Sequence, residues 1–157
     1  MTEEKIQFLQ NDYLGLVRKI DPAVTALWGK MNAQQMVEHV TAFFKISSGR
    51  LVFPLVTPSD QLARYREFLM SEKPFRENTR APASILPDEP LPLRNASMEA
   101  AIQGLDKSVA EFFACFKEDA GKKTLHPVFG ELNFLEWVQL HHKHVTHHLR
   151  QFAVPVL

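Results

Sequence analysis

Four segments of the chain carry apolar residues at the spacing of an amphipathic helix, and this pattern limits the possible folds more than any other feature. In each segment the apolar positions recur every three or four residues, which places them on one face of a helix with about 3.6 residues per turn. The segments are Thr2–Ile20, Asn32–Ser47, Ser97–Glu118 and Asn133–Phe152. No strand-like alternation of apolar and polar residues extends beyond a few positions. The sequence therefore predicts an all-α protein.

The ends of these segments carry residues typical of helix starts and stops. Asn32 is a favourable N-cap for the second helix. Asn133, with Glu136 three residues later, forms a capping-box pattern at the start of the fourth. Pro22 ends the first helix, and Pro155 prevents the last one from continuing.

A long connector, Gly49–Asn95, separates the second helix from the third. It contains seven prolines, and within it we expect one short helix over Ser59–Met70. Short links join the first helix to the second and the third to the fourth, so each of these pairs should be antiparallel. The connector is long enough to cross the molecule and lets the second and third helices run parallel. We expect a four-helix bundle in a single domain over residues 1–157.

The composition limits the function classes. Lys plus Arg equals Asp plus Glu, 18 each, so the net charge is zero, which argues against strong attraction to nucleic acid or an anionic membrane. We find no signal peptide and no apolar stretch near the roughly 18 residues of a membrane-spanning helix. The single cysteine, Cys115, excludes an internal disulfide and suits a reducing compartment. We therefore expect a cytoplasmic protein that binds neither nucleic acid nor membrane.

Five of the seven histidines lie between residues 141 and 148, in the fourth predicted helix. His144 and His148 are four residues apart and share one face of that helix. His39 lies on the apolar face of the second helix, where an unpaired imidazole would be costly to bury. These three residues predict a three-nitrogen metal site. Such a site leaves coordination positions open for water or substrate, as catalytic zinc sites do.

Other arrangements fit the same histidines. His141 with His144, or His144 with His147, could be the metal-binding pair. The whole cluster could instead lie at the surface. His39 could be a core histidine that is held by hydrogen bonds. The spacing alone does not choose between these arrangements.

Three segments resemble the DinB-like superfamily of four-helix-bundle metalloenzymes, and within it a branch described as a domain of unknown function. They are LWGKMNAQQMVEHV (Leu27–Val40), HPVFGELNFLEW (His126–Trp137) and HKHVTHHLRQF (His142–Phe152). The likeness covers both histidine-bearing helices and the link before the fourth, and it is slight in the connector. It implies that the helices follow an up-down-down-up order.

The resemblance also implies a ligand set and a chemistry. The superfamily takes one histidine from the second helix and an HxxxH pair from the fourth, which correspond here to His39, His144 and His148. Its usual Arg-Gly-Gln after the last ligand is replaced by Leu-Arg-Gln, so the glycine is missing. Characterised relatives act with low-molecular-weight thiols. The resemblance therefore implies a divalent transition metal, zinc or nickel, and a thiol S-transferase or hydrolase type of reaction on a small-molecule substrate.

Two further residues are candidates for the site. Gln35 lies one turn before His39 and could orient a ligand or a metal-bound water, or could be a polar residue at the edge of the bundle. His141 lies on the metal-facing side of its helix and could donate or accept a proton. We expect a turn-forming role for His126 and a packing role for Trp137.

Two other functions fit the same pattern. The chain could be a stress-response protein that holds a metal without turnover, since the superfamily is named for induction by DNA damage. It could also be an accessory domain of a larger catabolic enzyme. We further expect a homodimer, because Val138 and Leu149 fall on the side of the fourth helix away from the histidines and Leu135 lies beyond them.

Overall fold

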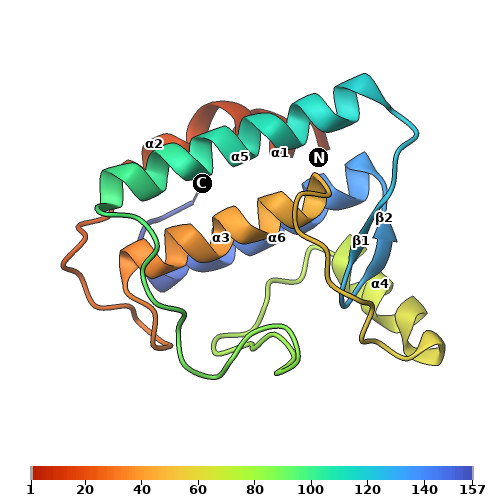
Figure 1. The fold of residues 1–157 in the computed structure, drawn as a ribbon, viewed down its shortest axis with the longest axis horizontal. Helices are drawn as coiled ribbons and strands as arrows, with labels where there is room; N and C mark the ends of the chain where they lie inside the picture. The colour runs from red at the N-terminus through yellow and green to blue at the C-terminus, as the bar shows by residue number, and fades with distance from the viewer. Residues whose placement is uncertain (1, 157) are drawn as a thin grey trace.

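A computed structural model describes residues 2–156, and most of this chain is helical (Figure 1). The helices are α1 (Thr2–Gln7), α2 (Tyr13–Arg18), α3 (Ala33–Ser47), α4 (Leu62–Met70), α5 (Met98–Glu118) and α6 (Phe134–Gln151). A π-helical turn, Phe8–Asp12, joins α1 to α2, and a 3-10 turn, Ser59–Gln61, precedes α4. The predicted helical segments, including the short helix of the connector, are thus present.

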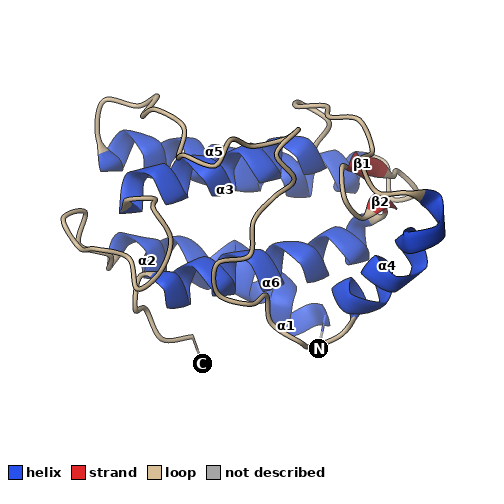
Figure 2. Ribbon diagram, turned by 90° about the horizontal axis from the view of Figure 1, so that it is seen from below, coloured by secondary structure: helices blue, strands red, loops and turns tan. Residues whose placement is uncertain are grey.

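The long helical runs lie in two layers. α3 and α5 form one layer, and α6 forms the other with the run from α1 to α2 (Figure 2). α3 and α5 run in the same direction along the long axis, whereas α6 and the α1–α2 run point the opposite way (Figure 1). The long connector between α3 and α5 makes this shared direction possible, because a short link would have forced the two helices to be antiparallel.

Both predicted capping residues act as expected. The Asn32 side chain accepts a hydrogen bond from the backbone N–H of Gln35, and the Gln35 side chain accepts one from the backbone N–H of Asn32. Asn133 and Glu136 form the same reciprocal pair at the start of α6. These caps fix where the two histidine-bearing helices begin and hence the height of each histidine along the molecule.

A small hairpin before α6 is the element that the sequence did not predict. Its strands, β1 (Thr124–His126) and β2 (Gly130–Leu132), pair antiparallel with Leu125 opposite Glu131. Three residues per strand are too few to produce a recognisable alternation. Gly130 has a φ of +84°, in the left-handed region that favours glycine, and this lets the chain reverse after Phe129.

The core corrects the reasoning behind the predicted homodimer. Val138 and Leu149 are both 0% exposed and pack inside the single chain, so neither is available for a second copy. Only Leu135, which is 52% exposed, remains on the outer side of α6. The helical spacing had placed the first two residues opposite the histidines, and that side of α6 is covered by the chain's own helices.

The connector packs back on the elements that carry the histidines. Near its start, the backbone N–H of Val56 donates to the carbonyl of Pro127 in the hairpin. Near its end, the carboxylate of Glu38 on α3 accepts hydrogen bonds from the backbone N–H groups of Arg94 and Asn95, at 2.8 and 3.1 Å. The connector is thus fixed near both of its ends, and between them it crosses α3 and α6 in the view of Figure 2.

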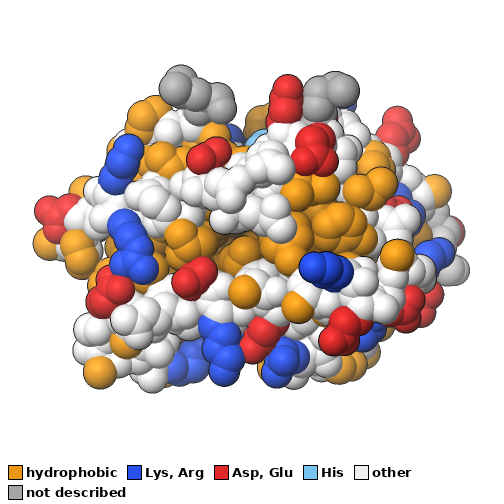
Figure 3. Space-filling model, turned by 90° about the horizontal axis from the view of Figure 1, so that it is seen from above, with side chains coloured by type: hydrophobic (Ala, Val, Ile, Leu, Met, Phe, Trp, Pro, Cys, Tyr) orange, Lys and Arg blue, Asp and Glu red, His pale blue; other side chains and the backbone are white. Residues whose placement is uncertain are grey.

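The outer surface carries charges of both signs. On the face shown in Figure 3, basic and acidic side chains are interspersed around apolar areas, and neither sign gathers into a continuous patch. Among residues 2–156, no helix combines the length and the apolar character that crossing a membrane would require.

Candidate metal centre

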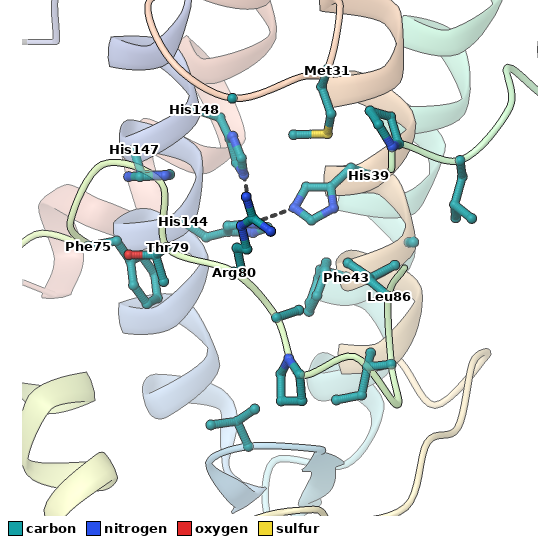
Figure 4. Close-up of a pocket in the computed structure, with 18 of the residues that line it drawn as sticks. Met31, His39, Phe43, Phe75, Thr79, Arg80, Leu86, His144, His147 and His148 are labelled. Carbon is teal, nitrogen blue, oxygen red and sulfur yellow. Dashed lines mark hydrogen bonds between the residues drawn. The ribbon is translucent and has the colours of Figure 1, made fainter. Parts of the chain in front are cut away.

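Three histidine rings meet between α3 and α6 (Figure 4). His39 comes from α3, and His144 and His148 come from successive turns of α6. Nε2 of His144 lies 3.0 Å from Nε2 of His39 and 3.0 Å from Nε2 of His148. One ring nitrogen from each residue lies within 4.8 Å of the other two. The structure therefore brings together the three residues that the sequence singled out.

The spacing of these nitrogens fits a divalent metal ion. Ligand nitrogens 2.0–2.1 Å from a tetrahedral zinc lie about 3.3 Å from one another. The two separations of 3.0 Å are close to that value, and the third pair, His39 with His148, lies within 4.8 Å. Without a metal, either one proton on His144 would serve two acceptor nitrogens or one of the two close contacts would have no proton, whereas an ion would take a lone pair from each ring. The three-histidine cluster is thus compatible with a metal site.

Burial keeps the three rings neutral at physiological pH. It lowers the pKa of His39 to about 4, and the charges of His147 and Arg94 act in the same direction. Burial also lowers the pKa of His144 and His148 well below the usual range. Because a neutral imidazole is the form that binds a metal, the lone pairs are available at pH 7 without prior deprotonation.

Gln151 selects which nitrogen of His148 faces the cluster. Its side-chain oxygen lies 2.7 Å from Nδ1 of His148, and an amide oxygen can only accept, so Nδ1 carries the proton. The amide is itself oriented, because its Nε2 donates to the carbonyl of Trp28 at 3.0 Å. Nε2 of His148 therefore presents a lone pair to the other two rings. This role of Gln151 was missed, although its position three residues after His148 was a usable signal.

A cavity of about 700 Å³ opens onto the histidines. Its walls come from α3, α6, the hairpin and the connector, and many of them are apolar or aromatic. The labelled side chains around the cluster in Figure 4 include Met31, Phe43, Phe75 and Leu86. The ring centroid of Phe43 lies 5.0 Å from those of both His39 and His144.

Charged side chains of the connector also line this cavity. Arg80 pairs with Asp88, and Asp88 also lies 3.3 Å from Nζ of Lys30 in the α2–α3 link. The interaction therefore ties the connector to the link before α3. A ligand that reaches the histidines enters a space that the connector helps to enclose.

A comparison with known protein families identifies a match that includes the histidine-bearing helices. The model of the DinB superfamily matches residues 7–152. The chain belongs to the DinB superfamily. The match includes α3, the hairpin and α6, and therefore every residue of the three-histidine cluster. Searches of curated proteins and of solved structures gave no match.

Two candidate site residues of this DinB superfamily chain line the cavity and have partners outside the three-histidine cluster. Gln35 uses its side-chain oxygen in the cap of α3, and its Nε2 donates to the carbonyl of Leu91 in the connector. It therefore anchors the connector, and the structure shows no bond from it to a histidine of the cluster. His141 is 1% exposed, and its ring stacks on Phe44 with centroids 3.8 Å apart. Its Nε2 lies 2.9 Å from Oγ of Ser47, so this ring packs in the core and is not one of the three clustered rings, although it borders the cavity.

The remaining histidines of α6 resolve the alternatives that the sequence left open. His147 is 5% exposed and lies beside the cluster, with its ring centroid 5.0 Å from that of His148. His142 points to the other side of α6 and contacts Phe8. The surface arrangement does not occur, and the pair that meets His39 is His144 with His148.

His126 and Trp137 have the structural roles that were expected. Nδ1 of His126 accepts hydrogen bonds from the backbone N–H groups of Val128 and Phe129, at 3.0 and 3.2 Å, and so forms the turn of the hairpin. Trp137 is fully buried, and its Nε1 donates to Oγ1 of Thr124. Both residues attach the hairpin to α6 and form part of the cavity wall.

Proposed function

We propose that this protein is a metal-dependent enzyme of the thiol S-transferase or hydrolase type, with His39, His144 and His148 holding zinc or nickel. The observation that carries the proposal is the convergence of three neutral ring nitrogens at the wall of a large cavity. Three protein ligands leave at least one coordination position for water or substrate, which is typical of catalytic rather than structural sites.

A bound divalent metal would lower the pKa of a coordinated water or thiol and so supply a nucleophile at neutral pH. The chain's own residues prepare the site for this chemistry. Gln151 holds His148 in the ligand tautomer, and the aromatic rings of Phe43 and Phe75 limit the access of water. Polar parts of a substrate could bind to Arg80 and Lys30, which line the cavity, if they replace the ion pairs that these side chains make with Asp88 and Glu89.

The proposed substrate is a small molecule, and a low-molecular-weight thiol is the preferred class. A cavity of about 700 Å³ has the size of a small-molecule site and is open enough to admit a second reactant. We further propose that residues 1–157 form one cytoplasmic domain, a four-helix bundle in up-down-down-up order. The parallel direction of α3 and α5 supports that order. The homodimer stays a prediction. Of the three α6 residues on which it was based, Leu135 is the one that is exposed.

Metal analysis of protein purified without a histidine tag tests the proposal. We expect one zinc or nickel ion per chain and a rise in the melting temperature when either ion is added to chelator-treated protein. Replacing His39, His144 or His148 by alanine should reduce metal affinity by more than the roughly 10–100-fold that loss of an orienting partner costs. His142→Ala is the matched control, since it removes a histidine from the same helix outside the cluster.

Turnover is tested separately on the metal-loaded protein. We expect consumption of free thiol when low-molecular-weight thiols are supplied with electrophilic acceptors, and none with the His144→Ala variant. Metal binding without turnover of any thiol or ester substrate would favour the non-catalytic metal-binding alternative. Absence of both metal binding and a thermal shift would refute the proposal as a whole.

A further inference from the structure

His126 has one ring nitrogen that the hairpin does not use. Nδ1 accepts from two backbone N–H groups, those of Val128 and Phe129, and therefore carries no proton. A neutral imidazole has one N–H, so the proton must lie on Nε2. The hairpin turn thus fixes the tautomer of His126 as Gln151 fixes that of His148, with the opposite nitrogen protonated.

The Nε2–H group is open to the cavity. His126 is only 5% exposed, yet it is among the residues that line the cavity. Its Nε2 has no hydrogen-bond partner among residues 2–156. It is also not among the fully buried polar atoms without a partner, which include Nδ1 of His141 and of His147. A buried N–H without a protein partner costs free energy unless water or a ligand accepts its proton.

Aromatic packing fixes the place of this donor relative to the metal cluster. The ring of His126 stacks on Phe43 with centroids 5.9 Å apart and an angle of 27° between the planes. Phe43 in turn contacts His39 and His144, at 5.0 Å each. His126 therefore lies one aromatic ring beyond the cluster, along the same cavity wall.

We propose that His126 is a substrate-binding residue whose Nε2–H donates a hydrogen bond to a carbonyl or carboxylate oxygen of a substrate that reaches the metal with its thiol. This inference rests on the proposed function, because it assumes a thiol at the metal. It adds a requirement for an acceptor oxygen at a fixed distance from the sulfur. Burial supports a donor that stays neutral, since it lowers the pKa of His126 to about 3. The ring then acts at neutral pH through its N–H, as a neutral electrophilic imidazole does.

Asparagine at this position separates the two roles of the ring. The Oδ1 atom of asparagine can accept from the backbone N–H two residues later, as in an Asx-turn, and so replaces Nδ1. Asparagine has no atom at the place of Nε2. His126→Asn should therefore keep the hairpin and remove only the donor. His126→Gln is the converse variant, because its longer amide reaches toward the cavity but leaves the two turn N–H groups without their acceptor.

The test measures binding of ω-mercaptocarboxylates of two to four carbons to the zinc-loaded protein by calorimetry, each against the alkanethiol of equal length. We expect one member of the series to bind about tenfold more tightly than its alkanethiol, as a hydrogen bond to a charged acceptor allows. His126→Asn should abolish this preference while leaving alkanethiol and zinc affinity unchanged. A preference that is the same in both proteins would overturn the role of His126. Failure of all thiols to bind would instead count against the proposed function.

A second measurement needs no variant. Nitrogen-15 NMR of the histidine side chains should show His126 protonated at Nε2 alone, and the Nε2–H signal should shift when the preferred mercaptocarboxylate is added. A ring protonated at Nδ1, or an Nε2–H signal that does not respond to a bound mercaptocarboxylate, would contradict the inference even if His126→Asn failed to fold.

Discussion

The side-chain oxygen of Gln151 lies 2.7 Å from Nδ1 of His148, and this contact decides which nitrogen of His148 faces the cluster. The same glutamine donates to the carbonyl of Trp28, so one side chain connects a proposed ligand to the link between α2 and α3. The metal site and the α2–α3 link are therefore coupled through Gln151.

Replacing Gln151 by leucine should lower metal affinity by about 10–100-fold, because His148 loses the acceptor that fixes its tautomer. Gln151→Glu keeps an acceptor oxygen for His148 but loses the donor to Trp28. This second variant should therefore retain metal affinity better than leucine does. Competition with a chromogenic chelator measures both, and equal losses in the two variants would show that the contact with Trp28 matters more than the tautomer.

A side chain at Gly29 should strain the backbone and displace Gln151. Its φ is +78°, and a Cβ atom there would lie 2.9 Å from Nε2 of Gln151. Gly29→Ala should destabilise the fold by about 1–2 kcal/mol from backbone strain and should also weaken metal binding by displacing Gln151. Gly49→Ala is the matched control, because Gly49 has the same φ but open space around its Cβ position. We expect the two variants to share a loss in melting temperature and only Gly29→Ala to lose metal affinity.

The sequence predicted the ligands better than their surroundings. Helical spacing placed His39, His144 and His148 among several possible arrangements, and the resemblance to the superfamily selected these three. The roles of His141 and Gln35 depended on partners that come from elsewhere in the chain. Phe44 and Ser47 on α3 bring His141 into the core, and Leu91 of the connector takes the amide of Gln35.

The hairpin also depends on contacts that the local spacing of residues does not reveal. Its two strands are too short to leave a periodic pattern, and they are held by long-range contacts. Thr57 donates to the carbonyl of Val128, and Arg66 of α4 pairs with Glu136 and donates to the carbonyl of Glu131. Such contacts between distant segments are set by tertiary packing, and the local spacing of residues does not predict them.

The metal-free protein should lose stability as the pH falls below about 6.5. Burial lowers the pKa of His126 to about 3 and that of His141 well below its usual range, so both rings bind a proton more readily after unfolding. Stability therefore rises with pH between the folded value and about 6.5 and is level above it, a change on the order of a few kcal/mol for one fully buried histidine. Chemical denaturation between pH 4 and 8 measures it. The dependence should be weaker in His126→Asn, and an unchanged profile would assign the effect to the other histidines.

Glu38 should prove essential for holding the end of the connector. Its carboxylate is 4% exposed and accepts from the backbone N–H groups of Arg94 and Asn95 and from the side chain of Gln34. Burial alone would raise its pKa, but the hydrogen bonds from Arg94, Gln34 and Asn95 outweigh burial, and the pKa is lowered. The carboxylate thus stabilises the fold above its unfolded pKa of about 4.3, and this contribution disappears as the pH falls through the folded value.

Glu38→Gln places an amide N–H against groups that are themselves donors, so it should cost about 1–3 kcal/mol of stability. Because Glu38 anchors only the end of the connector, hydrogen exchange should quicken mainly in residues 76–95, while α6 stays protected. Gln34→Ala is a milder comparison, since it leaves the carboxylate in place and removes one donor to it together with the bond from Gln34 to the carbonyl of Asn95. Uniform loss of protection across the helices would mean that Glu38 stabilises the whole fold rather than the segment that covers the histidines.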